Sequence, residues 1–252
     1  MSNRVAVHFS PHPDDELLGA PAALFALRDA GWRIVNVACS LGRAEQEPRR
    51  LAELEEACRR ARFELRRRHP DPATVLHELQ PDLVIAPNPH DRHPFHEQVG
   101  RAVLAAVSGA EAPETVWLWS VWGELELPSL VLEVSEQRFA EIVHALSAHV
   151  GELGRNDHRR LLRARTSANA VLGAERVFGF GALALPFARA ELLTELRLVD
   201  GRFMLCDPRV VRELDDPSET PAVPSSTDLT AWLAEPSLTT RFGARHANVR
   251  NT

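Results

Sequence analysis

The chain has 252 residues, of which 44% are hydrophobic, and a formal net charge of −6. This length suits one large domain, and the hydrophobic content is sufficient for a core. The negative charge argues against nucleic acid as the main partner, because nucleic-acid-binding domains are usually basic. No apolar run reaches the roughly 18 residues of a membrane span, and the N-terminus lacks a signal-peptide pattern. We therefore expect a cytoplasmic protein with no membrane partner.

Strand-like and helix-like segments alternate along most of the chain. Short apolar segments predict strands at residues 4–9, 32–40, 81–88, 115–122 and 129–135. Helical spacing of apolar residues predicts helices at 14–31, 47–68, 71–80, 93–109, 136–153 and 156–173. This alternation predicts an α/β, Rossmann-like, doubly wound domain in which helices flank a mostly parallel sheet.

The C-terminal region differs in composition from the domain that we assign to residues 1–213. Residues 214–252 are expected to form a linker and a C-terminal strap, because 214–228 are rich in Pro, Ser, Thr and acids. The strap contains apolar residues that need a surface to bury against: Trp232, Leu233, Leu238 and Phe242. We expect them to pack on the same domain. A lid, or a contact with another copy of the chain, is the alternative.

The three cysteines lie far apart in the sequence, at Cys39, Cys58 and Cys206. An odd number at such spacing is neither a disulfide framework nor a thiolate zinc site. We expect all three to be small buried residues.

Two polar turns are expected to meet at one edge of the sheet. The turn "SPHPDDE" (10–16) follows the first strand, and "NPHDRHPFH" (88–96) follows the strand at 81–88. In open α/β sheets, ligands bind beyond the carboxyl ends of the strands, where the strand order reverses. The sequence therefore predicts a functional site that combines these two turns.

The residue types in the two turns are those of a catalytic metal site. His12 and Asp15 lie three residues apart, and His96 adds a second histidine, which together make the two-histidine, one-carboxylate set of catalytic zinc sites. Asp14 and His93 remain for proton transfer and oxyanion support. Acidic residues at a helix start are also ordinary caps, but capping does not account for the histidines.

The motif "PHPDDE" followed by a His-x-x-His turn resembles the PIG-L/LmbE-like zinc N-deacetylases. The resemblance extends to Arg50 and Glu53 in "RRLAELEEACRRA" (49–61), to His149 in "ALSAHVGEL" (145–153) and to "LGAERVF" (172–178). It implies removal of an acetyl group from N-acetylglucosamine-type small molecules, or cleavage of amides of thiol conjugates.

The resemblance also implies roles for individual residues. A divalent ion, zinc or alternatively Fe²⁺, is held by His12, Asp15 and His96, with Asp14 as base and His93 as acid or oxyanion support. The family's second turn usually reads His-Pro-Asp-His, whereas this chain has Phe95 in place of the aspartate.

Other polar and aromatic residues are candidates for substrate binding. Arg43 follows the second strand, Arg50 lies on the helix after it, and Trp122 follows the strand at 115–122, where its ring could support a sugar. Asp91 is a further candidate, or a replacement for the carboxylate absent at Phe95.

Three more residues are expected to have structural or surface positions. Trp117 and Trp119 alternate with their neighbours along one strand and are expected in the core, and His158 is expected on the surface. The alternative to an enzyme is a metal-binding, sugar-recognising protein of the same fold that has lost turnover, which Phe95 motivates.

Overall fold

The computed structural model describes residues 4–67, 71–110, 113–213, 215–217 and 222–237. Its strands form a ten-stranded sheet in the order β10-β8-β7-β5-β4-β1-β2-β3, with β6 and β9 attached beside β7. The strands are Val5–Ser10 (β1), Arg33–Ala38 (β2), Glu64–Arg66 (β3), Leu83–Pro87 (β4), Thr115–Trp119 (β5), Leu130–Glu133 (β6), Ala190–Val199 (β7), Arg202–Cys206 (β8), Arg209–Val211 (β9) and Pro224–Asp228 (β10).

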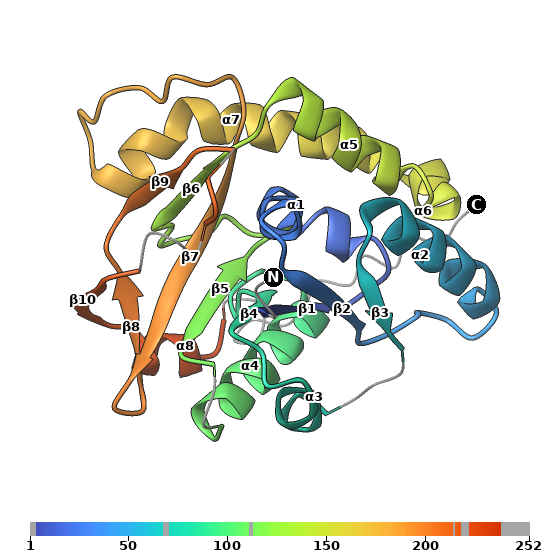
Figure 1. The fold of residues 1–252 in the computed structure, drawn as a ribbon, viewed down its shortest axis with the longest axis horizontal. Coiled ribbons are helices and arrows are strands. Elements are labelled where there is room, and N and C mark those ends of the chain that lie inside the picture. Colours follow the sequence, from blue (N-terminus) through green and yellow to red (C-terminus); the bar gives the residue numbers. More distant parts are fainter. Residues whose placement is uncertain (1–3, 68–70, 111–112, 214, 218–221, 238–252) are drawn as a thin grey trace.

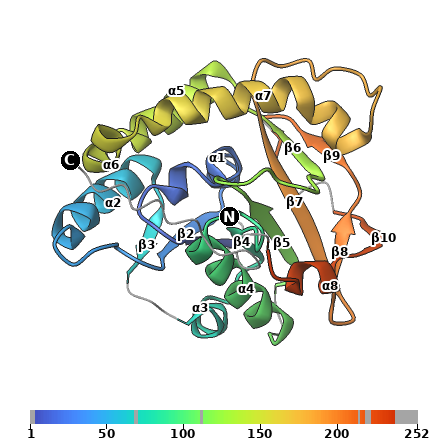
Figure 2. The ribbon, with the colours of Figure 1, turned by 180° about the vertical axis from the view of Figure 1, so that it is seen from behind.

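Helices cover both faces of this sheet (Figure 1). They are Asp15–Leu17 (the 3-10 turn η1), Pro21–Asp29 (α1), Glu47–Ala61 (α2), Pro72–Leu79 (α3), Pro94–Ser108 (α4), Glu136–Leu146 (α5), Val150–Arg155 (α6), His158–Phe178 (α7) and Thr230–Ala234 (α8). One core cluster joins α1, α2 and α5 to the sheet, and a second joins α3, α4 and α8 to its other face (Figure 2). The predicted fold class is confirmed.

The strand order places the reversal point at β1. Starting there, the chain proceeds to β2 and β3 on one side, then returns to β4 and β5 on the other, and all these neighbours pair in parallel. Every residue of β1 and β4 is buried, as expected of strands covered on both faces. The carboxyl ends of β1 and β4 are therefore adjacent, and the two polar turns leave the sheet side by side.

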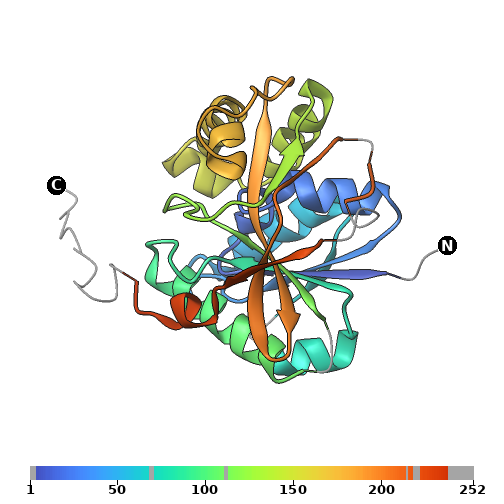
Figure 3. The same cartoon turned by 90° about the vertical axis from the view of Figure 1, so that its left-hand side faces the viewer.

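An antiparallel region that we did not predict completes the sheet. The long strand β7 pairs with β5, β6 and β8, and Figure 3 shows it extending from the α5 and α7 side to the hairpin with β8. The paired β7 and β8 are joined by a turn in which Asp200 and Gly201 both have positive φ, the twist that two-residue hairpins favour.

Three predicted helices begin, end or divide differently. The helix predicted at 14–31 begins at Pro21, because Asp14 adopts a positive φ and residues 15–17 form a 3-10 turn. The helix predicted at 47–68 ends at Ala61, where the left-handed Arg62 redirects the chain into β3. The helix predicted at 136–153 divides into α5 and α6 at Ser147–His149.

The C-terminal segment joins the sheet before it reaches α8. Residues 224–228, predicted as part of a linker, are instead β10, which pairs with β8. Leu233 is buried in the core cluster that contains α4, and the Trp232 ring stacks on His90 at 4.4 Å. Leu238 and Phe242 lie outside the described residues.

Two further expectations concern cysteines and membranes. Cys58 and Cys206 are buried as predicted, whereas Cys39 is only half-buried beside the end of β2. Within the described ranges, none of the helices is both long and apolar enough to cross a membrane.

Candidate metal centre and active site

The two polar turns meet at the carboxyl ends of β1 and β4. His12 and Asp15 follow β1, while His96 lies on the first turn of α4, after β4. Pro94 occupies the first position of α4, where its missing N–H would have no helical partner. The topology therefore brings together ligand-type residues that are far apart in sequence.

The donor atoms of His12, Asp15 and His96 have the spacing of a tetrahedral metal site. His12 Nδ1 lies 3.2 Å from His96 Nε2, and Asp15 Oδ2 lies 3.4 Å from the first atom and 3.3 Å from the second. Ligands at about 2.0–2.1 Å from a tetrahedral zinc ion would be roughly 3.3 Å from one another. The three residues thus fit a divalent ion with an open fourth position.

Carboxylates set the charge state of this cluster in the absence of an ion. Burial disfavours the charged ring of His96, but Asp15 and Asp91 outweigh it and raise its pKa to about 10. Burial likewise opposes ionisation of Asp15, but His96 and His12 hold the pKa of that carboxyl well below its usual range. Asp15 is therefore an anion ready to bind a cation.

Asp91 lies behind His96 and does not line the pocket. It is fully buried, and His96 donates from Nδ1 to Asp91 Oδ2 over 2.7 Å, which leaves Nε2 free to face the metal position. The prediction that Asp91 contacts substrate is therefore wrong, because no part of this side chain is exposed. It does orient a histidine, but that histidine is His96 and not His93.

A loop after β5 holds the other oxygen of Asp91. The backbone N–H groups of Val121, Trp122 and Gly123 donate to Asp91 Oδ1 over 2.7, 2.9 and 3.1 Å, and the Ser120 hydroxyl also donates to it. A carboxylate oxygen that accepts this many hydrogen bonds is fixed in position. The loop thereby fixes the orientation of His96.

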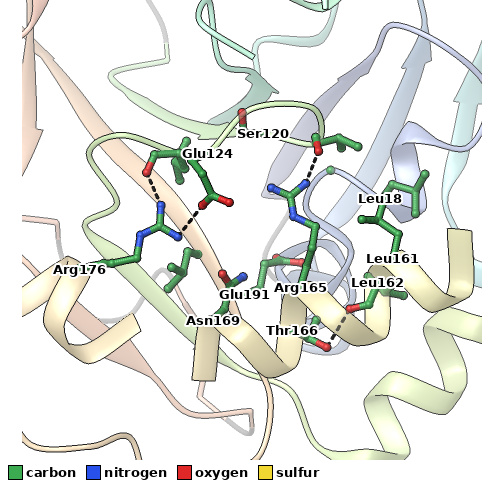
Figure 4. Close-up of a pocket in the computed structure, with 14 residues that line it drawn as sticks. Leu18, Ser120, Glu124, Leu161, Leu162, Arg165, Thr166, Asn169, Arg176 and Glu191 are labelled. Atoms are coloured by element: carbon green, nitrogen blue, oxygen red, sulfur yellow. Dashed lines mark hydrogen bonds and ion pairs between the residues drawn. The ribbon is translucent and has the colours of Figure 1, made fainter. Parts of the chain in front are cut away.

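Two arginines of α7 clamp this loop from the other side, around a small cavity that borders the metal pocket (Figure 4). Arg165 donates to the carbonyl oxygens of Val121 and Gly123 over 2.6 and 3.2 Å. Arg176 donates to the Leu125 carbonyl over 2.6 Å and pairs with Glu124. A continuous series of hydrogen bonds therefore connects α7, through the loop and Asp91, to His96.

Asp14 has a backbone conformation that few non-glycine residues adopt. Its φ is 105°, and its N–H donates to Glu16 Oε2 over 2.9 Å. Glu16 is fully buried, and its other oxygen lies 2.6 Å from Nε2 of His149. Strain of this kind persists only where surrounding contacts enforce it, and Glu16 and His149 supply those contacts. His149 thus supports the turn, which suits the position implied by the family resemblance.

The Asp14 carboxylate lines the pocket and pairs with a histidine from α7. His158 Nδ1 lies 3.2 Å from Asp14 Oδ2, and both side chains are more than nine-tenths buried. Burial raises the pKa of Asp14, although the hydrogen bond with His158 opposes the shift. The prediction that His158 lies on the surface is therefore wrong. The position of His158 at the start of a helix, shortly after the His149 segment, was the only sequence feature that could have indicated its place in the site.

His93 lies over the same space and, within the part of the chain that the structure describes, pairs with no carboxylate. Its ring centroid is 5.0 Å from that of His12 and 4.6 Å from that of His96, while its buried Nδ1 has no hydrogen-bond partner among the described residues. Burial, with repulsion from the rings of His96 and His12, lowers the pKa of His93 to about 4. Phe95 packs against His12 instead, with ring centroids 5.3 Å apart.

A cavity of about 920 Å³ opens over these groups. It is lined by His12, Asp14, Asp15, His93 and His96, and also by three of the residues predicted to bind substrate, namely Arg43, Arg50 and Trp122. The Trp122 side chain is half-exposed, whereas Trp117 and Trp119 are buried as predicted. The cavity wall also includes Arg49, Glu152 and Arg155, which we did not predict, because charged residues on amphipathic helices ordinarily face solvent.

No family model and no curated protein matches the chain, whereas several solved structures match it. The conserved protein TT1542 from Thermus thermophilus matches with a TM-score of 0.59 and 22% identity over 76% of this chain and 94% of its own. N,N'-diacetylchitobiose deacetylase from Pyrococcus horikoshii matches with a TM-score of 0.58 and 17% identity over 77% and 84%. Teicoplanin deacetylases, one in a zinc-inhibited form, match at 15–17% identity.

These matches confirm the fold: the neighbours include deacetylases of the LmbE/PIG-L type. The 4-carboxy-2-hydroxymuconate hydratase GalB from Pseudomonas putida also matches, with a TM-score of 0.58 and 15% identity over 76% of this chain and 95% of that one. The same fold thus carries more than one reaction, and the reaction of this chain has to be argued from its own side chains.

Proposed function

We propose that the protein is a metal-dependent hydrolase that removes an acyl group, chiefly acetyl, from the amide nitrogen of an amino-sugar-type substrate. The observation that carries this proposal is the set of three donor atoms at 3.2–3.4 Å, beside a separate buried carboxylate, Asp14, that faces the same cavity. Structural neighbours that are deacetylases support the reaction class.

The metal ligands are His12, Asp15 and His96, and the ion is zinc or, alternatively, Fe²⁺, since two imidazoles and one carboxylate suit either. A divalent ion bound there supplies a Lewis acid for the acyl carbonyl and lowers the pKa of a bound water to about 7. Asp91 and the loop at 120–123 keep His96 in the tautomer that such binding needs.

Asp14 is the general base. Its pKa is raised by burial, which makes the carboxylate a better proton acceptor, and His158 orients it from the side of α7. The proton it accepts is then available to the leaving amine. His93 is neutral at physiological pH, so it supports the carbonyl oxygen through an N–H hydrogen bond and not as an imidazolium.

The experiment is amine release by the zinc-loaded protein from a panel of N-acyl amino sugars and N-acyl thiol conjugates. We expect turnover on the amino sugars, and we expect His12→Ala to lose both metal and activity while the far-ultraviolet circular dichroism stays unchanged. Equal metal content in wild type and His12→Ala, measured by elemental analysis, would contradict the ligand assignment.

A metal-binding protein that recognises sugars without turnover is the second candidate, favoured by the orphaned Nδ1 of His93 and by Phe95. The same panel separates the two. Saturable binding of N-acetylglucosamine with no amine released would favour this candidate, whereas release from thiol conjugates alone would identify an amidase of that substrate class.

A further inference from the structure

One wall of the cavity carries an excess of arginine. Arg43, Arg49, Arg50 and Arg155 line it, on the loop before α2, on α2 and on α6. Two carboxylates lie among them: Glu152, which contacts three of these arginines, and Glu53, which pairs with Arg49. Guanidinium groups therefore outnumber carboxylates on this wall, and Arg43 has no acidic partner among the described residues.

Arg50 is buried without being fully compensated. It is 8% exposed, and its contacts with the Leu41 and Pro13 carbonyls and with Glu152 are all long, at 3.4 Å. The Glu152 contact is made by Nε, and this atom forms no hydrogen bond of good geometry with any described residue. Withdrawing a cation from water is costly unless strong partners replace the water, so this guanidinium is suited to an anion that enters the cavity.

The backbone makes room for Arg50 at a specific position. Gly42 has a φ of +85°, and a Cβ added there would stand 2.1 Å from Arg50 Nη1. The positive φ favours glycine, and the guanidinium of Arg50 occupies the space that a side chain at this position would take. Because Arg50 also donates to the carbonyl of Pro13, between His12 and Asp14, its guanidinium adjoins the turn that holds the metal ligands.

We propose that this arginine wall is an anion-binding subsite and that the substrate carries a carboxylate or phosphate group near its scissile amide. The inference rests on the proposed function and narrows its substrate class. Guanidinium groups bind both anions through paired N–H donors, and the geometry of Arg50 and Arg43 on one wall supplies such donors beside the metal turn.

The test compares kcat/KM of the zinc-loaded protein for N-acetylglucosamine, N-acetylglucosamine 6-phosphate and N-acetylmuramic acid, which carries a carboxylate. We expect at least one anionic substrate to be favoured by roughly tenfold or more, and the better of the two identifies the anion. Arg50→Lys, which keeps the charge but loses the fork, and Arg43→Gln should each lower the anionic-to-neutral ratio severalfold. Arg59→Gln, an exposed arginine on the same helix, is the control and should leave the ratio unchanged.

If the neutral sugar is hydrolysed at least as efficiently as both anionic sugars, the subsite is overturned while the proposed function stands.

If no substrate is hydrolysed, equilibrium dialysis with orthophosphate and with malonate tests the wall directly. Weaker anion binding by Arg43→Gln than by Arg59→Gln then supports the subsite although the proposed function fails. Equal binding by the two variants, or no binding by either, overturns the subsite. Arg43 is exposed, so its variant is expected to fold even if Arg50→Lys does not.

Discussion

Asp14 has a strained backbone, and its buried carboxylate is not one of the three proposed metal ligands. A φ of 105° costs free energy that an ordinary turn would avoid. A hydrogen bond from the Asp14 N–H to the buried Glu16 helps to hold the backbone in this conformation. The strain separates the directions of neighbouring carboxylates, so that Asp15 joins the histidines while Asp14 pairs with His158. Adjacent residues thereby acquire different chemical tasks.

Replacing Asp14 should separate metal binding from catalysis. Asparagine tolerates positive φ nearly as well as aspartate, so Asp14→Asn is expected to fold and to retain its metal. The rate should fall by about 10²–10⁴-fold, the usual contribution of a positioned base. Activity and elemental analysis are measured together, with Asp157→Asn, an exposed neighbour of His158, as the control. Wild-type turnover by the metal-loaded Asp14→Asn protein would remove Asp14 from the mechanism.

Phe95 removes a charge that would act on the histidine rings. An opposite charge within about 4–6 Å favours protonated imidazole, and the Phe95 ring is 5.3 Å from that of His12, itself 5.0 Å from that of His93. Phe95→Asp should therefore raise the pKa of His93 from about 4. Because the neutral ring is the form that supports the carbonyl oxygen, the acidic limb of kcat/KM against pH should move to higher pH. An unmoved limb at unchanged zinc content contradicts this account.

Asp91→Asn provides the comparison for Phe95→Asp. Because Asp91 accepts from His96 and is not hydrogen-bonded to His93, this variant should lose metal affinity, and the loss of the Asp91 charge should lower the pKa of His93 and not raise it.

At the scale of elements, the loop after β5 and the helix α7 act together on His96, a proposed metal ligand. Arg165 donates to the carbonyl oxygens of Val121 and Gly123. The backbone N–H groups of the same two residues donate to Asp91. Asp91 in turn accepts a hydrogen bond from His96. Each contact restricts the next, so a residue on α7 positions a ligand that it never touches.

Arg165→Gln is expected to release the loop and weaken metal binding. Substitutions behind a metal ligand typically cost about 10–100-fold in affinity, and this change acts one step further out, so we expect roughly tenfold. Competition with a fluorescent chelator measures the affinity. Arg160→Gln, an exposed position on α7, should match wild type. If both variants bind metal as wild type does, the clamp has no role in positioning His96.

At the scale of the whole molecule, Glu191 connects the antiparallel region to the Rossmann-like half. It lies on β7 and accepts hydrogen bonds from the N–H groups of Ala22 and Ala23, at the start of α1, over 2.9 Å each. Burial raises the pKa of Glu191 from 4.5 to about 7, although these two hydrogen bonds oppose the shift.

The raised pKa of Glu191 predicts how stability depends on pH. Between pH 4.5 and about 7 the folded protein holds a proton that the unfolded chain has lost, so stability falls as the pH rises through this window. The full difference corresponds to about 3 kcal/mol in the free energy of unfolding. Urea unfolding at pH 4.5, 6 and 7.5 should show a shallower dependence for Glu191→Gln than for wild type or for the exposed Glu114→Gln. Identical slopes in all three proteins would contradict the assignment.

Much of the fold, and the meeting of the three candidate metal ligands, followed from short-range patterns. Buried parallel strands are continuous apolar runs, and His12, Asp15 and His96 lie in turns directly after such strands, so their meeting at one edge follows from the α/β alternation. The strands β7 to β9 were missed, because a strand in a mixed sheet is selected by its neighbours as much as by its own sequence.

Only the tertiary structure determines the contacts between residues that are not related by any local sequence pattern. Asp91 is two positions from His93 yet binds His96, because the turn before α4 points its carboxylate inward, towards the loop at 120–123. His158 reaches Asp14 across 144 positions, and Arg50 reaches Pro13 across 37. Sequence spacing determines which side chains share a turn or a helix face, whereas packing of α6 and α7 against the edge of the sheet determines which of them face the cavity over the candidate metal site.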